Sequence, residues 1–180
     1  MQLSASNPLQ RLIAVTIIGL GPNREDSIMV KARASILIDR PPEQVFGFIA
    51  DDFVDNYARW SPEVKQLEAL TPGPLGLGSR MRQVRVDQGR RSESSFKVTA
   101  FESPQCLEFA ESTDLFRTGY WLAPAGGQTR LEFGFELRRL ELYMRPFEKL
   151  IRVAIQDGAQ RVVRNIKTLA ERELATEATE

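Results

Sequence analysis

The chain contains no histidine and a single cysteine, Cys106. Histidine is the commonest general base and the commonest metal ligand, so its absence excludes serine–histidine and cysteine–histidine nucleophile systems. One cysteine can form neither an intramolecular disulfide nor a multi-cysteine zinc site. The sequence therefore predicts no metal and no cofactor. The shortage of cysteine fits a reducing, cytoplasmic compartment, and we expect Cys106 to be an inert, small apolar side chain.

The chain also lacks an excess of charge of either sign, because 24 Lys and Arg balance 24 Asp and Glu among 180 residues. This balance argues against a general nucleic-acid binder, which carries a basic stripe. The hydrophobic content of 42% is enough for the core of one domain. The sequence leaves the oligomeric state open.

No hydrophobic run is long enough to span a bilayer. The longest apolar stretch covers residues 12–20, and no clear signal-peptide cleavage site follows it. We expect residues 1–29 to form an extension outside the domain, residues 30–175 to form one domain, and residues 176–180 to be a frayed tail. The domain pattern begins directly after Met29, so Met29 is a candidate natural start, which the sequence alone leaves open.

Alternating apolar residues predict strands, and hairpin-length connections predict that the strands pair antiparallel. Pro42 suits the first turn of a short helix, and Ser61-Pro62 ends a second one. A long amphipathic helix is predicted from about Pro146 to Glu173. Together these elements predict an α+β fold in which a curved seven-stranded sheet surrounds the C-terminal helix. The predicted strands are residues 30–38, 64–70, 79–86, 92–101, 106–112, 116–122 and 129–137.

Gly158 interrupts the long helix, where glycine costs about 1 kcal/mol relative to alanine. Close packing against a neighbour explains such a glycine, and so does a kink or an open space beneath the helix. Both explanations stay open.

Several local motifs follow one another along the chain: Ile36-Leu37-Ile38 at the end of the first strand, Pro42-Glu43-Gln44-Val45-Phe46, Trp60-Ser61-Pro62, the glycine-rich residues 73–80, Gly126-Gly127-Gln128-Thr129-Arg130 and Arg145-Pro146-Phe147. In this order they resemble the SRPBCC superfamily, which has the helix-grip or START-like fold, and within it the polyketide cyclase/dehydrase type 2 proteins. The likeness covers residues 30–173. It implies an elongated, largely apolar cavity between the sheet and the long helix. Members bind lipids, sterols, polyketides or plant hormones, and some cyclise or dehydrate polyketides.

The period of two in the strands predicts which polar residues face this cavity. Val84 and Val86 place Arg82 on the inner face, and Leu107 and Phe109 place Glu111 there. Arg82 would then orient a ligand carbonyl or carboxylate, with Glu111 as its partner or as a proton acceptor. The alternative is a solvated pair at a strand end.

The remaining candidates are mostly aromatic. Tyr57 and Trp60 either line the mouth of the cavity or anchor the core. Tyr120 is expected to line the cavity, with Trp121 on the opposite face. The full expected ligand-binding set is Tyr57, Trp60, Arg82, Ser94, Phe96, Phe109, Glu111, Tyr120, Phe133, Phe135, Ile155 and Gly158.

Three functions fit these expectations. The first is a carrier or sensor of a small hydrophobic molecule, which needs an apolar cavity with a few polar groups. The second is a cyclase or dehydratase, in which Arg82 stabilises an enolate and Glu111 or Tyr120 moves protons. The third is an interaction module whose cavity is filled by phenylalanines at 96, 109, 133 and 135. A cavity of about 300 Å³ or more separates the first two from the third.

Overall fold

The seven predicted strands form one antiparallel sheet in the computed structural model, which describes residues 28–87, 89–140 and 142–174. The sheet order is β1-β7-β6-β5-β4-β3-β2. The predicted helix-grip arrangement is thereby confirmed. The strands are β1 (Ile28–Ile38), β2 (Val64–Ala69), β3 (Arg80–Asp87), β4 (Arg90–Glu102), β5 (Cys106–Glu111), β6 (Phe116–Ala125) and β7 (Gln128–Leu140).

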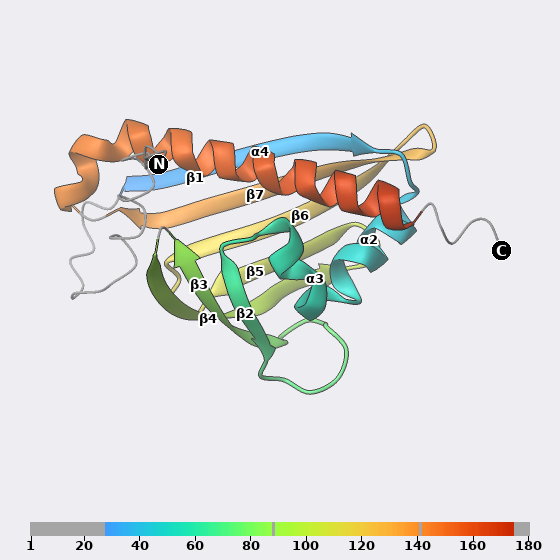
Figure 1. Ribbon diagram of the computed structural model, residues 1–180, viewed down its shortest axis with the longest axis horizontal. Coiled ribbons are helices and arrows are strands. Elements are labelled where there is room, and N and C mark those ends of the chain that lie inside the picture. Colours follow the sequence, from blue (N-terminus) through green and yellow to red (C-terminus); the bar gives the residue numbers. More distant parts are fainter. Residues whose placement is uncertain (1–27, 88, 141, 175–180) are drawn as a thin grey trace, which may run out of the picture.

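Within the described residues, three α-helices and one 3₁₀ helix accompany the sheet. Helices α2 (Pro42–Ala50) and α3 (Phe53–Trp60) follow β1, and the 3₁₀ helix (Leu142–Phe147) leads into α4 (Glu148–Glu173). The long helix α4 lies along β1 and β7, while α2 and α3 lie toward the C-terminal end of α4 (Figure 1). No helix in the described ranges combines the length and apolar character needed to cross a membrane.

β1 begins at Ile28, so residues 28 and 29 belong to the first strand. The expectations for the rest of the N-terminal extension and for residues 176–180 concern parts of the chain outside the described residues.

The core lies between the sheet and α4, and its largest members are aromatic. Trp60 is fully buried, and its Nε1 donates a hydrogen bond of 3.2 Å to the hydroxyl of Tyr120. Phe53 stacks on Phe109, with 4.8 Å between ring centroids, and Phe96 meets Phe109 edge to face at 5.4 Å. This aromatic cluster packs α3 against β4, β5 and β6.

The outer face of the sheet carries Trp121, as the alternation in β6 predicted. Its indole ring lies across Gly119 and Gly134, where a Cβ atom on Gly134 would come within 2.7 Å of the ring. Trp121 Nε1 donates to Glu108 at 3.0 Å, and the guanidinium of Arg33 lies 5.0 Å from the ring centroid. The two glycines therefore leave the space that this ring occupies.

Candidate functional site

A cavity of about 360 Å³ opens between the inner face of the sheet and α4. Its apolar wall includes phenylalanines of β6 and β7 and the facing side of α4. Its polar wall comes from α3 and from the ends of β3 and β4. The apolar wall includes Phe116, Phe133, Phe135, Ile155, Gly158 and Val162, and the polar wall includes Tyr57, Ser61, Gln83, Arg85, Ser92 and Ser94.

Half of the predicted ligand-binding residues meet at this cavity, because the structure brings together six of the twelve. The strand faces that hold Ser94, Phe133 and Phe135 were thus predicted correctly. The six are Tyr57, Ser94, Phe133, Phe135, Ile155 and Gly158.

Gly158 lies at the centre of the part of α4 that faces the cavity. Its neighbours at i±3 and i±4 are Ala154, Ile155, Arg161 and Val162, and all four line the cavity. A Cβ atom built on Gly158 would meet no described atom within 4 Å. Of the two explanations left open by the sequence, the structure supports an open space beneath the helix.

Arg82 does not face the cavity, so the prediction for this residue is wrong. Its guanidinium pairs with Glu68 at 2.7 Å and with Glu93 at 3.1 Å, and its side chain is 43% exposed. The inner positions of β3 are instead Met81, Gln83 and Arg85, and the first two are almost fully buried. Val84 is buried as well, although it lies on the same side as Arg82, so the valine did not mark the inner face.

Glu111 is buried, but it serves the β5–β6 turn. Its Oε2 accepts hydrogen bonds from the backbone N–H groups of Thr113 (2.8 Å) and Leu115 (3.2 Å) and from the Thr113 hydroxyl (2.6 Å). These bonds supply the partners that a buried carboxylate needs. The predicted pairing of Glu111 with Arg82 is wrong, because Arg82 is held by Glu68 and Glu93 on the other face of the sheet.

The other predicted residues that do not line the cavity belong to the aromatic core. Tyr120 is almost fully buried, and burial raises the pKa of its hydroxyl well above the ordinary value. Trp60 takes the anchoring role rather than the position at the mouth. Phe96 and Phe109 fill the space beside them.

The polar wall centres on Arg85, which the sequence analysis missed. Burial by itself lowers the pKa of Arg85, but Tyr57, Asp87 and Glu63 raise it on balance, so the guanidinium stays positively charged. Its Nε lies 3.4 Å from Asp87, and its side chain is 28% exposed. Burial raises the pKa of the Tyr57 hydroxyl, and this rise is opposed by the charge of Arg85 and by hydrogen bonds with Ser61 and Arg85.

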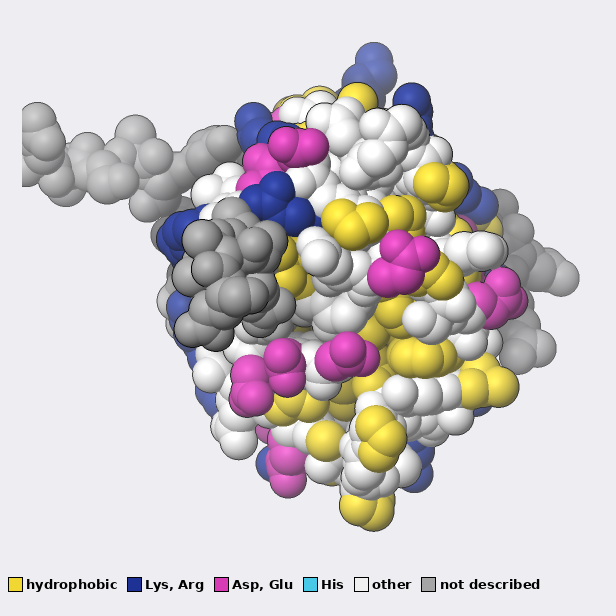
Figure 2. Space-filling view, turned by 90° about the vertical axis from the view of Figure 1, so that its right-hand side faces the viewer, with side chains coloured by type: hydrophobic (Ala, Val, Ile, Leu, Met, Phe, Trp, Pro, Cys, Tyr) yellow, Lys and Arg dark blue, Asp and Glu magenta, His cyan; other side chains and the backbone are white. Residues whose placement is uncertain are grey.

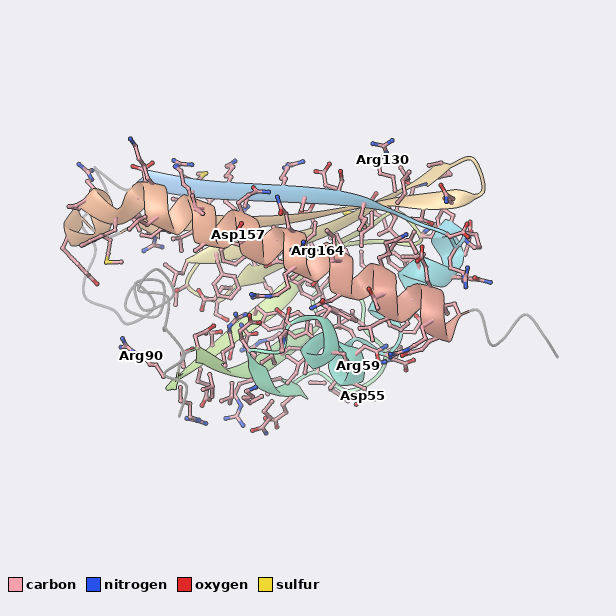
Figure 3. All side chains as sticks on the ribbon, turned by 45° about the horizontal axis from the view of Figure 1, so that its top comes forward. Asp55, Arg59, Arg90, Arg130, Asp157 and Arg164 are labelled. Carbon is pink, nitrogen blue, oxygen red and sulfur yellow. The ribbon has the colours of Figure 1, made fainter. Side chains whose placement is uncertain are left out.

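Charged side chains surround the mouth. Glu63, in the loop after α3, pairs with Arg161 of α4, so this ion pair connects the two sides of the cavity. Asp157 of α4 also lines the cavity. Figure 3 labels it on this helix, on the N-terminal side of Arg164.

A second pocket of about 120 Å³ lies between the α2–α3 junction and the loop that precedes β3. It is lined by Asp51, Asp52 and Asp55 together with Val54 and Leu75. Hydrophobic and acidic side chains lie next to one another over this end of the molecule (Figure 2). The pocket is smaller than the range of about 300–1,000 Å³ that is usual for drug-sized ligands.

Neither a metal site nor a reactive thiol is found among the described residues. Across the described ranges, no three His, Cys, Asp or Glu side chains are grouped so that they could hold a metal ion. Burial, together with Glu108, raises the pKa of the Cys106 thiol to about 11, so the thiol is unreactive at neutral pH.

Comparisons with solved structures and with a family model agree with the helix-grip fold described above. A search of curated proteins found no match. Among solved structures, the aromatase/cyclase ZhuI from Streptomyces sp. R1128 is similar, with a TM-score of 0.67 and 12% identity over 82% of this chain and 96% of that one. The Polyketide_cyc-like protein Cgl2372 from Corynebacterium glutamicum has a TM-score of 0.60 and 18% identity over 85% of this chain and 98% of that one.

Major latex-like protein 151 from Panax ginseng gives a TM-score of 0.61 and 10% identity over 79% of this chain and 97% of that one. At such identities these likenesses show a shared fold. The model of the family described as "Polyketide cyclase / dehydrase and lipid transport" matches residues 29–171. The chain therefore belongs to the polyketide cyclase/dehydrase and lipid transport family.

Proposed function

We propose that this protein binds and carries a small hydrophobic molecule that has one polar end. The observation that carries the proposal is the cavity of about 360 Å³ between the sheet and α4. Its volume falls within the range typical of ligand sites, and its walls combine a broad apolar surface with a few convergent polar groups. Family membership supports the same conclusion at the level of ligand binding.

Arg85 determines which polar end fits best. It remains cationic, its Nε lies 3.4 Å from Asp87, and its side chain is 28% exposed and lines the cavity. A carbonyl, carboxylate or other oxygen acceptor on the ligand would form a charge-assisted hydrogen bond there. Such a ligand would place its apolar body against Phe133, Phe135 and Ile155.

An interaction module with a filled cavity is less well supported. Phe96 and Phe109 do pack in the core. Phe133 and Phe135, however, line the space without closing it, so about 360 Å³ stays open.

A cyclase or dehydratase is the second candidate function, and the contact of Arg85 with Tyr57 in the cavity wall favours it. A fixed positive charge can stabilise an enolate, and a tyrosine with a raised pKa stays a proton donor at neutral pH. A β-hydroxyketone such as 4-hydroxy-4-phenylbutan-2-one tests this, because loss of water gives an enone that absorbs in the near ultraviolet. Faster conversion by the wild type than by the R85M variant would favour the enzyme, and binding without conversion supports carriage.

The binding proposal is tested first by native mass spectrometry of the purified protein, which we expect to carry non-covalent hydrophobic adducts. Fluorescence titration with 1-anilinonaphthalene-8-sulfonate, an apolar probe with one anionic group, then tests Arg85. We expect R85M to weaken binding about 10-fold or more.

The matched control is R82M, which removes an arginine from the opposite face of the same strand and should leave the affinity unchanged. Equal affinities of R85M and the wild type would remove Arg85 from the binding site. A wild-type protein that carries no adduct and binds no probe would refute the proposed function.

A further inference from the structure

Gln83 is the most deeply buried polar residue of the cavity wall, and half of its amide is paired. It is 2% exposed, and its Nε2 donates a hydrogen bond of 3.0 Å to the hydroxyl of Ser94 on the neighbouring strand. The other end, Oε1, is buried and has no hydrogen-bond partner within the described part of the chain. Both residues line the cavity, and they are direct partners in the register of β3 with β4.

A buried carbonyl oxygen without a donor is unfavourable, and the described residues around Gln83 supply no donor to it. The backbone of Arg85, two residues along the same face, is about 6.6 Å further along the strand, and the Nε of its side chain lies 3.4 Å from Asp87. An apolar molecule that fills the cavity would leave this buried oxygen without a donor. The donor must then come from the molecule itself.

We propose that Gln83 makes the cavity selective for molecules that bear a hydroxyl or N–H donor, which Oε1 accepts. This inference rests on the proposed binding function. Ser94 is the positioning residue, because its hydroxyl holds Nε2 and so directs Oε1 away from the pairing. The hydroxyls of Ser92 and Thr118 also line the cavity, but a hydroxyl can rotate to donate or accept and therefore selects neither. Among the uncharged residues described on this wall, Gln83 supplies the fixed acceptor, whereas the carboxylates of Glu63 and Asp87 are engaged by Arg161 and Arg85.

A pair of probes that differ only in the donor tests the inference. 1-Naphthol has a hydroxyl donor, whereas 1-methoxynaphthalene keeps the oxygen and the ring but has no donor. Their dissociation constants are measured by titration calorimetry with the wild type and with Q83M, a variant of similar shape. The ratio of the two constants is compared between proteins, so the greater hydrophobicity of the ether cancels.

We expect the ratio to favour 1-naphthol about 10-fold more in the wild type than in Q83M, because a site built to accept a hydrogen bond rejects an analogue that lacks the donor. S94A is a second, milder variant. It frees the amide to turn and present Nε2 to the ether oxygen, so the preference should fall there too. Q66M, at an exposed glutamine of β2, is the matched control and should keep the wild-type ratio.

The outcomes separate this inference from the proposed function. Equal ratios in the wild type, Q83M and S94A, with both probes bound, would overturn the role of Gln83 and leave cavity binding standing. A wild-type protein that binds neither probe would overturn the binding proposal, and the selectivity of Gln83 with it.

Discussion

Replacing Gly158 gives the sharpest test of the open space beneath α4. Alanine and leucine at this position both change the free energy of unfolding through helix propensity and through burial of the added side chain, but in different proportions. Gly158 lies at the centre of the cavity-facing side of α4, and an added Cβ would meet nothing within 4 Å. Both side chains should therefore enter the cavity without a clash.

The expected magnitudes follow from this geometry. Gly158→Ala removes the glycine penalty and should raise the free energy of unfolding by about 1 kcal/mol, or the Tm by about 2–4 °C. Gly158→Leu adds burial of an apolar side chain, which contributes up to about 1.5–3 kcal/mol when burial is complete. If Gly158 were instead packed tightly, leucine would destabilise the fold by about 1–3 kcal/mol. The two accounts thus differ in the sign of the change.

Ligand affinity should change in the opposite direction to stability. The four side-chain carbons of leucine occupy space that about four ligand atoms would fill. At about 0.3 kcal/mol per atom this weakens binding by about 1.2 kcal/mol, or about 8-fold. Urea denaturation gives the stabilities and titration with 1-naphthol gives the affinities. Gln160→Leu, at an exposed position of α4, is the control and should change neither affinity nor packing. A less stable Gly158→Leu protein that binds as tightly as the wild type would refute the reasoning.

Three further predictions concern the rest of the fold. Arg59 lowers the pKa of Glu173 to about 2, so this pair stabilises the fold above about pH 4.5 and the contribution is lost as the pH falls toward 2. Both side chains are about one-third exposed, so Glu173→Gln should cost less than about 1 kcal/mol at pH 6 and only a small part of that at pH 2 in urea titrations. A difference that does not vary with pH would contradict this. Iodoacetamide should alkylate Cys106, whose pKa is about 11, about 100-fold more slowly at pH 8 in the folded than in the unfolded protein, and equal rates would argue against burial of the thiol. Gly134→Ala should lower stability by about 1–3 kcal/mol, because its Cβ would meet the indole ring stacked on it, whereas Gly76→Ala, which meets nothing within 4 Å, should not; equal stabilities would contradict the close approach.

Most of the fold could be predicted from the sequence because burial follows the period of each element. In β7 the alternation of Leu131, Phe133 and Leu137 with polar residues marks the inner face, and all three are buried. In α4 the helical spacing of Ile151, Ile155 and later apolar residues marks the face toward the sheet. Such patterns depend on local geometry alone, so a single chain is enough to reveal them.

The inner face of β3 could not be predicted in this way, because side chains on both of its faces are buried. Val84 is buried on one side, and Met81 and Gln83 are buried on the other. Gln83 and Arg85, which line the cavity from β3, are polar, so an alternation of apolar residues does not mark their face. Their placement follows only from the register, which sets Gln83 opposite Ser94. Pairing across strands is a long-range property, and the sequence of one strand does not reveal it.

The sequence also did not reveal whether an inward side chain is covered by the core or reaches the cavity. The alternation in β6 placed Tyr120 on the inner face, and it is there, but Trp60 and Phe109 pack against it and separate it from the cavity. The period of a strand gives the face of a residue and not the identity of the element that covers it. Whether an inward aromatic side chain packs in the core or lines a cavity is therefore decided by α3 and α4 together.

The most direct test of ligand binding between the sheet and α4 is the measurement of intermolecular nuclear Overhauser effects between 1-naphthol and the methyl-labelled protein. We expect contacts from the ring protons of the probe to the methyl groups of Ile155 and Val162, which line the cavity. Contacts confined to methyl groups outside the cavity, such as those of the exposed Leu77, would contradict the account.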